Sequence, residues 1–83
     1  MTRVTLYTRE GCHLCDDARA VLRAVGEDMK FAYDEVHIAP GDGAYEKYNL
    51  RIPVVEIDGH PAFYARVNEK RLRALLREAE GGQ

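Results

Sequence analysis

The stretch VTLYTREGCHLC, residues 4–15, contains the signals that decide the fold. Apolar side chains alternate with polar or aromatic ones through residues 3–8 with the period of a β-strand, and Gly11 then lets the chain turn. The helical signal that follows consists of apolar residues three and four positions apart: Leu14, Ala18, Val21, Leu22 and Val25. The sequence therefore predicts a strand over 3–8 and a helix over 13–25 that ends at Gly26.

Two cysteines, Cys12 and Cys15, stand at the junction between this strand and this helix. Three residues of helical advance place their side chains on neighbouring parts of one face, so the two sulfurs can approach each other. The free amides and the positive dipole end of a helix N-terminus stabilise a thiolate. We therefore predict that Cys12 is the attacking sulfur and that Cys15, one turn further in, is the resolving sulfur that releases a mixed disulfide.

Charged neighbours of the pair act in opposite directions on a Cys12 thiolate. Arg9 and His13 favour the thiolate, whereas the carboxylates of Asp16 and Asp17 in the first helical turn oppose it. The two carboxylates also stabilise the start of a helix whatever its function. The sequence leaves the sign of the net effect open.

The middle of the chain predicts a second strand and a short helix. Alternating apolar residues indicate a strand over 31–38, in which Asp34 and Glu35 break the alternation and predict an exposed side or a bulge. After a loop, residues 44–49 can form one or two helical turns. We expect the two tyrosines of this segment, Tyr45 and Tyr48, to pack on the core rather than line a peptide groove.

The C-terminal half predicts a hairpin and a last helix. Residues 54–57 form one strand, and the turn signal Asp58-Gly59 joins it to an antiparallel strand with Phe63, Ala65 and Val67. Asn68 can then cap a helix. Its apolar stripe is Leu72, Leu75, Leu76 and Ala79.

The predicted order is strand, helix, strand, short helix, strand, strand, helix. This order combines a crossover unit and a hairpin in one sheet, so we expect an α/β fold with a four-stranded mixed sheet flanked by helices. A chain of 83 residues has room for one domain, which we place at 1–83.

Composition excludes several classes of function. Twelve basic and 14 acidic side chains give a net charge of −2, too weak a field to gather nucleic acid or anionic lipid. The sequence shows neither a secretion signal nor a membrane span, so we expect a cytoplasmic protein. In a reducing compartment, two cysteines at this spacing are catalytic or metal-binding more often than structural.

A metal site is the main alternative to dithiol chemistry. Tetrahedral zinc normally takes four ligands, and beyond the cysteines the chain offers carboxylates and three histidines at no recognised metal spacing: His13, His37 and His60. We therefore predict no metal site. A non-catalytic module that senses redox state, or that holds a metal together with a partner, stays open as the second hypothesis.

The segment Ile52-Pro53-Val54 begins a strand, where proline is tolerated. Base rates for X-Pro bonds favour the trans form. Together with Cys12-His13-Leu14-Cys15 and the order of elements, however, this segment resembles the thioredoxin superfamily, and specifically a divergent branch of small glutaredoxin-like proteins. The resemblance covers nearly the whole chain. It implies a cis Pro53 that faces the cysteine pair and backbone groups of Ile52 that pair with an extended substrate.

The resemblance also implies a function and its partners. It implies a monomeric thiol–disulfide oxidoreductase without a bound cofactor, which reduces protein disulfides or glutathione mixed disulfides and is regenerated by glutathione or a flavin reductase. Arg9 matches a basic position that glutaredoxins use toward a glutathione carboxylate. The substrate-binding residues would be Arg9, His13, Leu14, Ile52 and Pro53.

Two departures from the glutaredoxin pattern count against glutathione. The central dipeptide is His13-Leu14 and not the Pro-Tyr usual in that family. Glutaredoxins also carry Gly-Gly and then Asp after their last strand, whereas this chain has bulkier residues over 62–67.

Overall fold

The computed structural model describes residues 1–81 and confirms the predicted α/β fold class. The predicted domain extends to residue 83, and its last two residues lie outside the described part. The elements are β1 (Arg3–Thr8), α1 (His13–Asp28), β2 (Ala32–His37), α2 (Gly43–Tyr48), β3 (Val54–Ile57), β4 (His60–Tyr64) and α3 (Glu69–Gly81). Their order is the predicted one.

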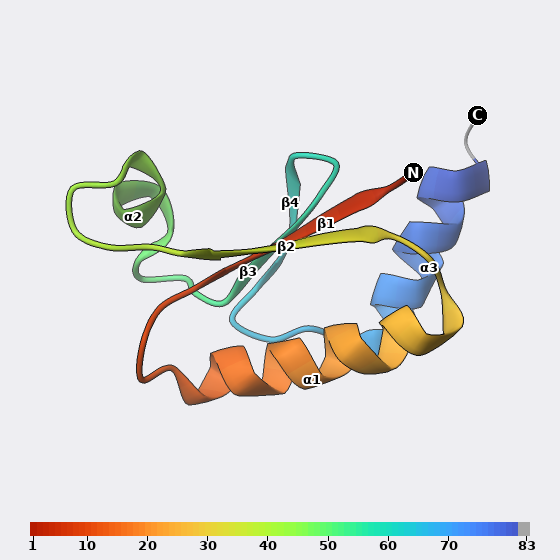
Figure 1. Cartoon of the computed structure of the whole chain (residues 1–83), viewed down its shortest axis with the longest axis horizontal. Coiled ribbons are helices and arrows are strands. Elements are labelled where there is room, and N and C mark those ends of the chain that lie inside the picture. The colour runs from red at the N-terminus through yellow and green to blue at the C-terminus, as the bar shows by residue number, and fades with distance from the viewer. Residues whose placement is uncertain (82–83) are drawn as a thin grey trace.

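The four strands form one mixed sheet with the order β2-β1-β3-β4 (Figure 1). β1 and β2 are parallel, as a crossover through α1 requires, and both β1–β3 and β3–β4 are antiparallel. In the β1–β3 pair Tyr7 lies opposite Val54. The segment that follows β1 and the segment that precedes β3 therefore meet at one end of the sheet.

α1 and α3 pack on one face of the sheet, where the main core lies (Figure 1). The strands supply alternate residues to it, because successive side chains point to opposite faces. Its buried members are Val4, Leu6, Ala18, Leu22, Val25, Val55, Phe63, Leu72 and Leu76. A second cluster around Ile38, Tyr48 and Val54 packs α2 against the sheet, with Tyr45 partly buried beside it. Both tyrosines of α2 thus pack on the core, as predicted.

α1 is longer than the sequence predicts, because it continues through Gly26 to Asp28. The apolar stripe also continues: Val25 is fully buried, and Met29 packs against the same core. The Met29 N–H donates to the carbonyl of Val25 and closes the helix. Packing of this last turn therefore overrides the weak helix propensity of Gly26.

β4 is shorter than predicted, because it ends at Tyr64 and leaves Ala65 and Val67 in the connection to α3. Ala65 adopts a positive φ of 67°, which turns the chain out of the strand. Its N–H donates to the carbonyls of Arg51 and Pro53, at 3.1 and 2.8 Å. These bonds fix the turn.

No bulge lies at Asp34 and Glu35; Asp34 is exposed, as expected, whereas Glu35 is half-buried beside Arg19. β2 pairs with β1 in unbroken register, and as an edge strand it leaves one of its sides open. A shift in pairing register occurs elsewhere in the sheet, between Val55 and Glu56 of β3.

Two local signals are confirmed. Asp58 and Gly59 both have positive φ, as a tight hairpin turn requires. Asn68 caps α3, because its side-chain oxygen accepts the N–H of Arg71 at 2.8 Å.

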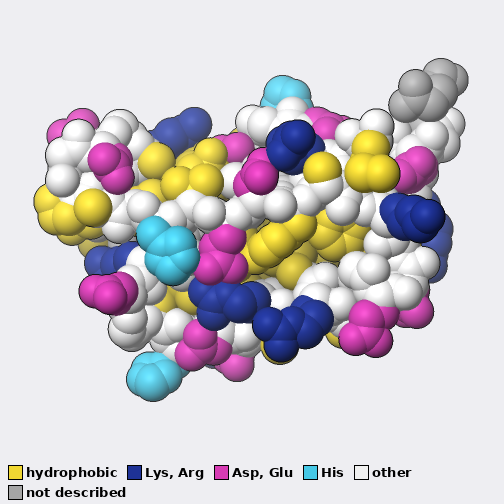
Figure 2. Space-filling view, in the orientation of Figure 1, with side chains coloured by type: hydrophobic (Ala, Val, Ile, Leu, Met, Phe, Trp, Pro, Cys, Tyr) yellow, Lys and Arg dark blue, Asp and Glu magenta, His cyan; other side chains and the backbone are white. Residues whose placement is uncertain are grey.

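Charges of both signs are interspersed over the face shown in Figure 2, in keeping with the net charge of −2. No helix within residues 1–81 is long and apolar enough to cross a membrane.

Candidate active site at the start of α1

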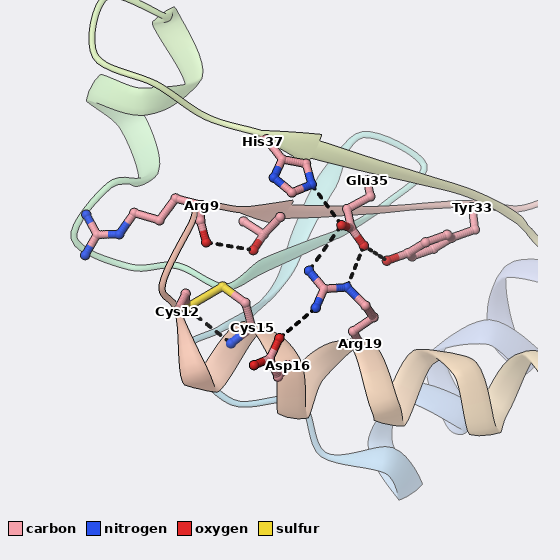
Figure 3. A network of polar contacts seen from close by, with 9 residues as sticks. Arg9, Cys12, Cys15, Asp16, Arg19, Tyr33, Glu35 and His37 are labelled. Carbon is pink, nitrogen blue, oxygen red and sulfur yellow. Dashed lines mark hydrogen bonds and ion pairs between the residues drawn. A yellow bond between two sulfur atoms is a disulfide. The ribbon is translucent and has the colours of Figure 1, made fainter.

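Cys12 and Cys15 are joined by a disulfide at the start of α1 (Figure 3). Cys12 is the N-cap residue with an extended backbone, and Cys15 lies one turn into the helix with its Cα 5.2 Å away. The backbone N–H of Cys15 donates to the Cys12 sulfur at 3.2 Å. A free amide of the first helical turn is thus directed at Cys12, where it would stabilise negative charge.

The two sulfurs differ in their access to solvent. Cys15 is 1% exposed and belongs to the buried interior, whereas Cys12 is half-buried. A second molecule can therefore reach the site through Cys12, and Cys15 lies behind it.

A network of charges begins one residue after the pair and runs to the edge strand (Figure 3). Asp16 accepts from Arg19 at 2.8 Å, and Arg19 also donates to both carboxylate oxygens of Glu35 on β2, at 2.8 and 3.1 Å. Glu35 further accepts from the hydroxyl of Tyr33 and contacts His37. Asp16, one of the two carboxylates expected to oppose a Cys12 thiolate, is thus partly neutralised.

The pairing with Arg19 governs the ionisation of Glu35. Hydrogen bonds from Arg19 lower the pKa of Glu35 to about 2, and the Tyr33 hydroxyl contributes further. The same contact raises the pKa of the Arg19 guanidinium. Burial, followed by the contact with Glu35, raises the pKa of Tyr33.

Ile52 and Pro53 lie at the same end of the sheet as the cysteines, because Val54 pairs with Tyr7 near the end of β1. The Ile52–Pro53 peptide bond is cis, and Pro53 is buried. Ile52 is half-buried, and its backbone makes no hydrogen bond with any residue of 1–81.

The other predicted site residues are placed differently. His13 is exposed as the first residue of α1. Leu14 is half-buried and lines a small cavity of about 80 Å³ together with Ala65 and Val67. Arg9 is exposed, and its guanidinium forms no ion pair within the described chain and extends away from the Glu35 network (Figure 3). The structure therefore brings Leu14 next to the segment that departs from the glutaredoxin pattern.

The histidines do not assemble with the cysteines. Among residues 1–81, no group of three or more His, Cys, Asp or Glu side chains is arranged to hold a metal ion. His37 contacts Glu35 on β2, and His60 is the exposed first residue of β4.

Sequence reasoning missed Arg19 and Glu35. The spacing of Asp16 and Arg19, three positions apart on a helix, is a recognisable ion-pair signal. Glu35 lies on another element, and only the parallel pairing of β1 and β2 brings it to α1.

A second missed carboxylate, Glu56, is buried on β3. It accepts the hydroxyl of Tyr48 at 2.6 Å and that of Tyr7 at 3.3 Å. Burial, followed by the contacts with this carboxylate, raises the pKa of Tyr48, and the same causes raise that of Tyr7.

A mixed sheet in this order, with a cysteine pair at the start of its first helix, defines the thioredoxin-fold class. Residues 3–77 match the family described as Glutaredoxin-like domain (DUF836), and the chain belongs to this family. Together with the disulfide-bonded pair, family membership supports a redox function in the broad sense.

Known proteins are similar to this chain in sequence and in fold. An uncharacterized protein of Mycobacterium tuberculosis is 32% identical over 96% of this chain and 88% of its own length. A crystallised protein from X. campestris is 34% identical with a TM-score of 0.72, covering 89% of this chain and 95% of that one. Glutaredoxin 1 from Francisella tularensis shares the fold, with 20% identity and a TM-score of 0.59 over 95% of this chain and 96% of that one.

Proposed function

We propose that this protein is a thiol–disulfide oxidoreductase that acts through Cys12 and Cys15. The observation that carries the proposal is the position of Cys12: it caps α1, accepts the N–H of Cys15 and is the more accessible of the two sulfurs. A thiolate at such a position is stabilised and reachable, as nucleophilic attack on a disulfide requires.

The exchange takes place in two substitutions at sulfur. The Cys12 thiolate attacks one sulfur of a substrate disulfide, forms a mixed disulfide and expels the other sulfur as a thiolate. The Cys15 thiolate then attacks the Cys12 sulfur, forms the intramolecular disulfide and releases the second substrate thiolate. Two electrons pass from the protein dithiol to the substrate, and an external thiol or a reductase system restores the dithiol.

The surroundings favour an extended protein segment as substrate. The free backbone of Ile52 beside Pro53 can pair with such a segment, and His13 and Leu14 would flank it on the helix side. Arg9, which has no ionic partner in the described chain, can attract a carboxylate. Ala65 and its bulkier neighbours line the side where glutaredoxins have glycines, so glutathione is the less favoured substrate. We propose that the protein acts in the cytoplasm and as a monomer.

The test compares the wild-type protein with Cys12→Ser and Cys15→Ser in an insulin reduction assay. We expect Cys12→Ser to abolish turnover, because the attacking sulfur is gone. Cys15→Ser should accumulate a mixed disulfide with the substrate, which mass spectrometry detects as an adduct removed by dithiothreitol. Circular dichroism of each variant serves as the folding control.

Equal activity of all three proteins would eliminate the proposal. A metal assay on freshly purified protein addresses the alternative module: stoichiometric metal that depends on both cysteines, with no reductase activity, would favour that module. Reduction of glutathione mixed disulfides in preference to insulin would overturn the assignment of protein substrates and retain the exchange chemistry.

A further inference from the structure

A groove of about 530 Å³ lies between α1 and the edge strand β2, on the far side of Arg19 from the cysteines. Its apolar walls come from Leu22 of α1, from Met29 and Phe31 in the connection, and from the ring of Tyr33. Figure 2 shows this area as a hollow of hydrophobic side chains bordered by charged side chains, Lys and Arg as well as Asp and Glu. A volume of this size lies within the range of small-molecule sites, about 300–1,000 Å³.

The charges that line the groove are mostly positive. Arg23 and Lys30 line it and form no hydrogen bond or ion pair with any residue of 1–81. Arg19 also lines the groove but is committed to Asp16 and Glu35, and the carboxylate of Glu35 is occupied in turn. The two cations left without partners are therefore available to an anion.

We infer that this groove binds a small amphipathic anion, a molecule with an aromatic or aliphatic body and a single carboxylate or sulfonate group. The body would lie on Met29 and Phe31, away from water, and the anionic group would contact Arg23 and Lys30. An apolar ligand without a charge would leave Arg23 and Lys30 unpaired. An anion without an apolar body would leave the apolar walls exposed to water. The inference is independent of the chemistry proposed for Cys12.

Gly26 provides a way to close the groove without disturbing the fold. It lines the groove within α1, and a Cβ placed on it would lie 3.6 Å from the ring of Phe31, an ordinary contact distance. A larger side chain at this position would extend into the space that the ligand needs. Because glycine is a poor helix former, the substitution should not weaken α1.

The experiment titrates two fluorescent dyes into the full chain: anionic 8-anilino-1-naphthalenesulfonate and neutral N-phenyl-1-naphthylamine. The charge variant is Arg23→Gln with Lys30→Gln, and the matched control is Arg71→Gln with Arg77→Gln on the exposed side of α3. The steric variant is Gly26→Leu. Thermal unfolding of every variant is measured in parallel.

We expect the wild-type protein to bind the anionic dye at one saturable site and the neutral dye about tenfold more weakly. The Arg23 and Lys30 substitutions should weaken binding of the anionic dye by about tenfold. The α3 control should change the affinity for this dye by less than twofold. Gly26→Leu should abolish binding of both dyes and retain or raise the melting temperature.

Other results would overturn the inference. An affinity for the anionic dye that the charge variant leaves unchanged, or binding that survives Gly26→Leu, would place the dye elsewhere on the surface. Equal affinity for the two dyes would show that the groove does not select an anion. A dimer in sedimentation that Gly26→Leu dissociates would identify a second copy of the chain as the occupant.

Discussion

Arg19 of α1 donates hydrogen bonds to both carboxylate oxygens of Glu35 on β2, and so joins the helix that begins at the cysteines to the edge of the sheet. The same guanidinium neutralises Asp16, the residue after Cys15. One side chain thus influences both the attachment of β2 and the electrostatics near the reactive sulfurs.

The Arg19–Glu35 contact should make stability depend on pH in the acid range. The pKa of Glu35 falls from 4.5 to about 2 in the folded protein. Because a lowered carboxylate pKa favours the folded state only while the group is ionised, its contribution is complete above pH 4.5. The contribution is then lost as the pH falls toward about 2.

Glu35→Gln tests this dependence. The variant should be less stable than the wild-type protein at pH 7 by about 1 kcal/mol, since the pair is partly exposed. The difference in stability between the variant and the wild-type protein should vanish near pH 2. Urea unfolding at a series of pH values measures this difference. The control is Glu78→Gln, at an exposed residue that forms no ion pair within residues 1–81. A constant difference at every pH would contradict the assignment.

Arg19 should also influence the reactivity of Cys12. Arg19→Gln leaves the Asp16 carboxylate without its cation, and the repulsion should lower the thiolate fraction of Cys12. We expect alkylation of the reduced protein by iodoacetamide at pH 7 to slow about twofold, a size typical of a screened surface charge. Adding Asp16→Asn should restore the rate, whereas Arg23→Gln alone should leave it unchanged. A slowed rate that Asp16→Asn does not restore would indicate a structural effect instead.

The features predicted from the sequence are those that depend on local signals. Three such signals are the strand alternation around Leu6, the helical stripe through Leu22 and the Asp58-Gly59 turn. Each can be recognised from a few neighbouring residues. The order of these elements along the chain is then compatible with only a few sheet topologies. The placement of Cys12 at the start of α1 follows from the same local reasoning.

The features that were missed depend on contacts between distant segments. Gly26 is a local stop signal, but burial of Val25 and Met29 carries α1 past it. The sequence around Ala65 gives no indication of its positive φ. Hydrogen bonds from its N–H to the carbonyls of Arg51 and Pro53 stabilise this conformation. Glu35 is a surface residue in the sequence pattern, and only the sheet register brings it to Arg19.

The capping contact of Cys12 should contribute to folding. In a Cys15→Ser background, which excludes the disulfide, Cys12→Ser retains an oxygen that can accept the N–H of residue 15, whereas Cys12→Ala cannot. We expect the alanine variant to be less stable than the serine variant by about 1 kcal/mol in urea unfolding. Equal stabilities would show that this hydrogen bond is not maintained without the disulfide.

Ala65 should tolerate glycine better than other alanines of this chain. Its φ of 67° lies in the left-handed region, which costs a residue with a Cβ about 1 kcal/mol. Ala65→Gly removes this cost but increases the freedom of the unfolded chain, so we expect a net change between zero and about 0.5 kcal/mol of stabilisation. Ala24→Gly, at an exposed position within α1, should instead destabilise by about 1 kcal/mol. Similar losses of stability at both positions would show that the backbone at Ala65 is not strained.

Tyr48 should matter more than Tyr7 for the buried carboxylate of Glu56. The Tyr48 hydroxyl lies 2.6 Å from one carboxylate oxygen, whereas the Tyr7 hydroxyl lies 3.3 Å from the other. Tyr48→Phe therefore removes the shorter bond to a largely desolvated charge, and we expect a loss of about 2 kcal/mol.

The matched variant for this comparison is Tyr7→Phe, which should lose less than about 1 kcal/mol, because its bond is longer and Tyr7 is only partly buried. Adding Glu56→Gln to each variant measures the coupling in a double-mutant cycle, which should be larger for Tyr48. If the two phenylalanine variants lose equal stability, or if Glu56→Gln is uncoupled from Tyr48, then packing of the rings rather than this hydrogen bond holds α2 against β3.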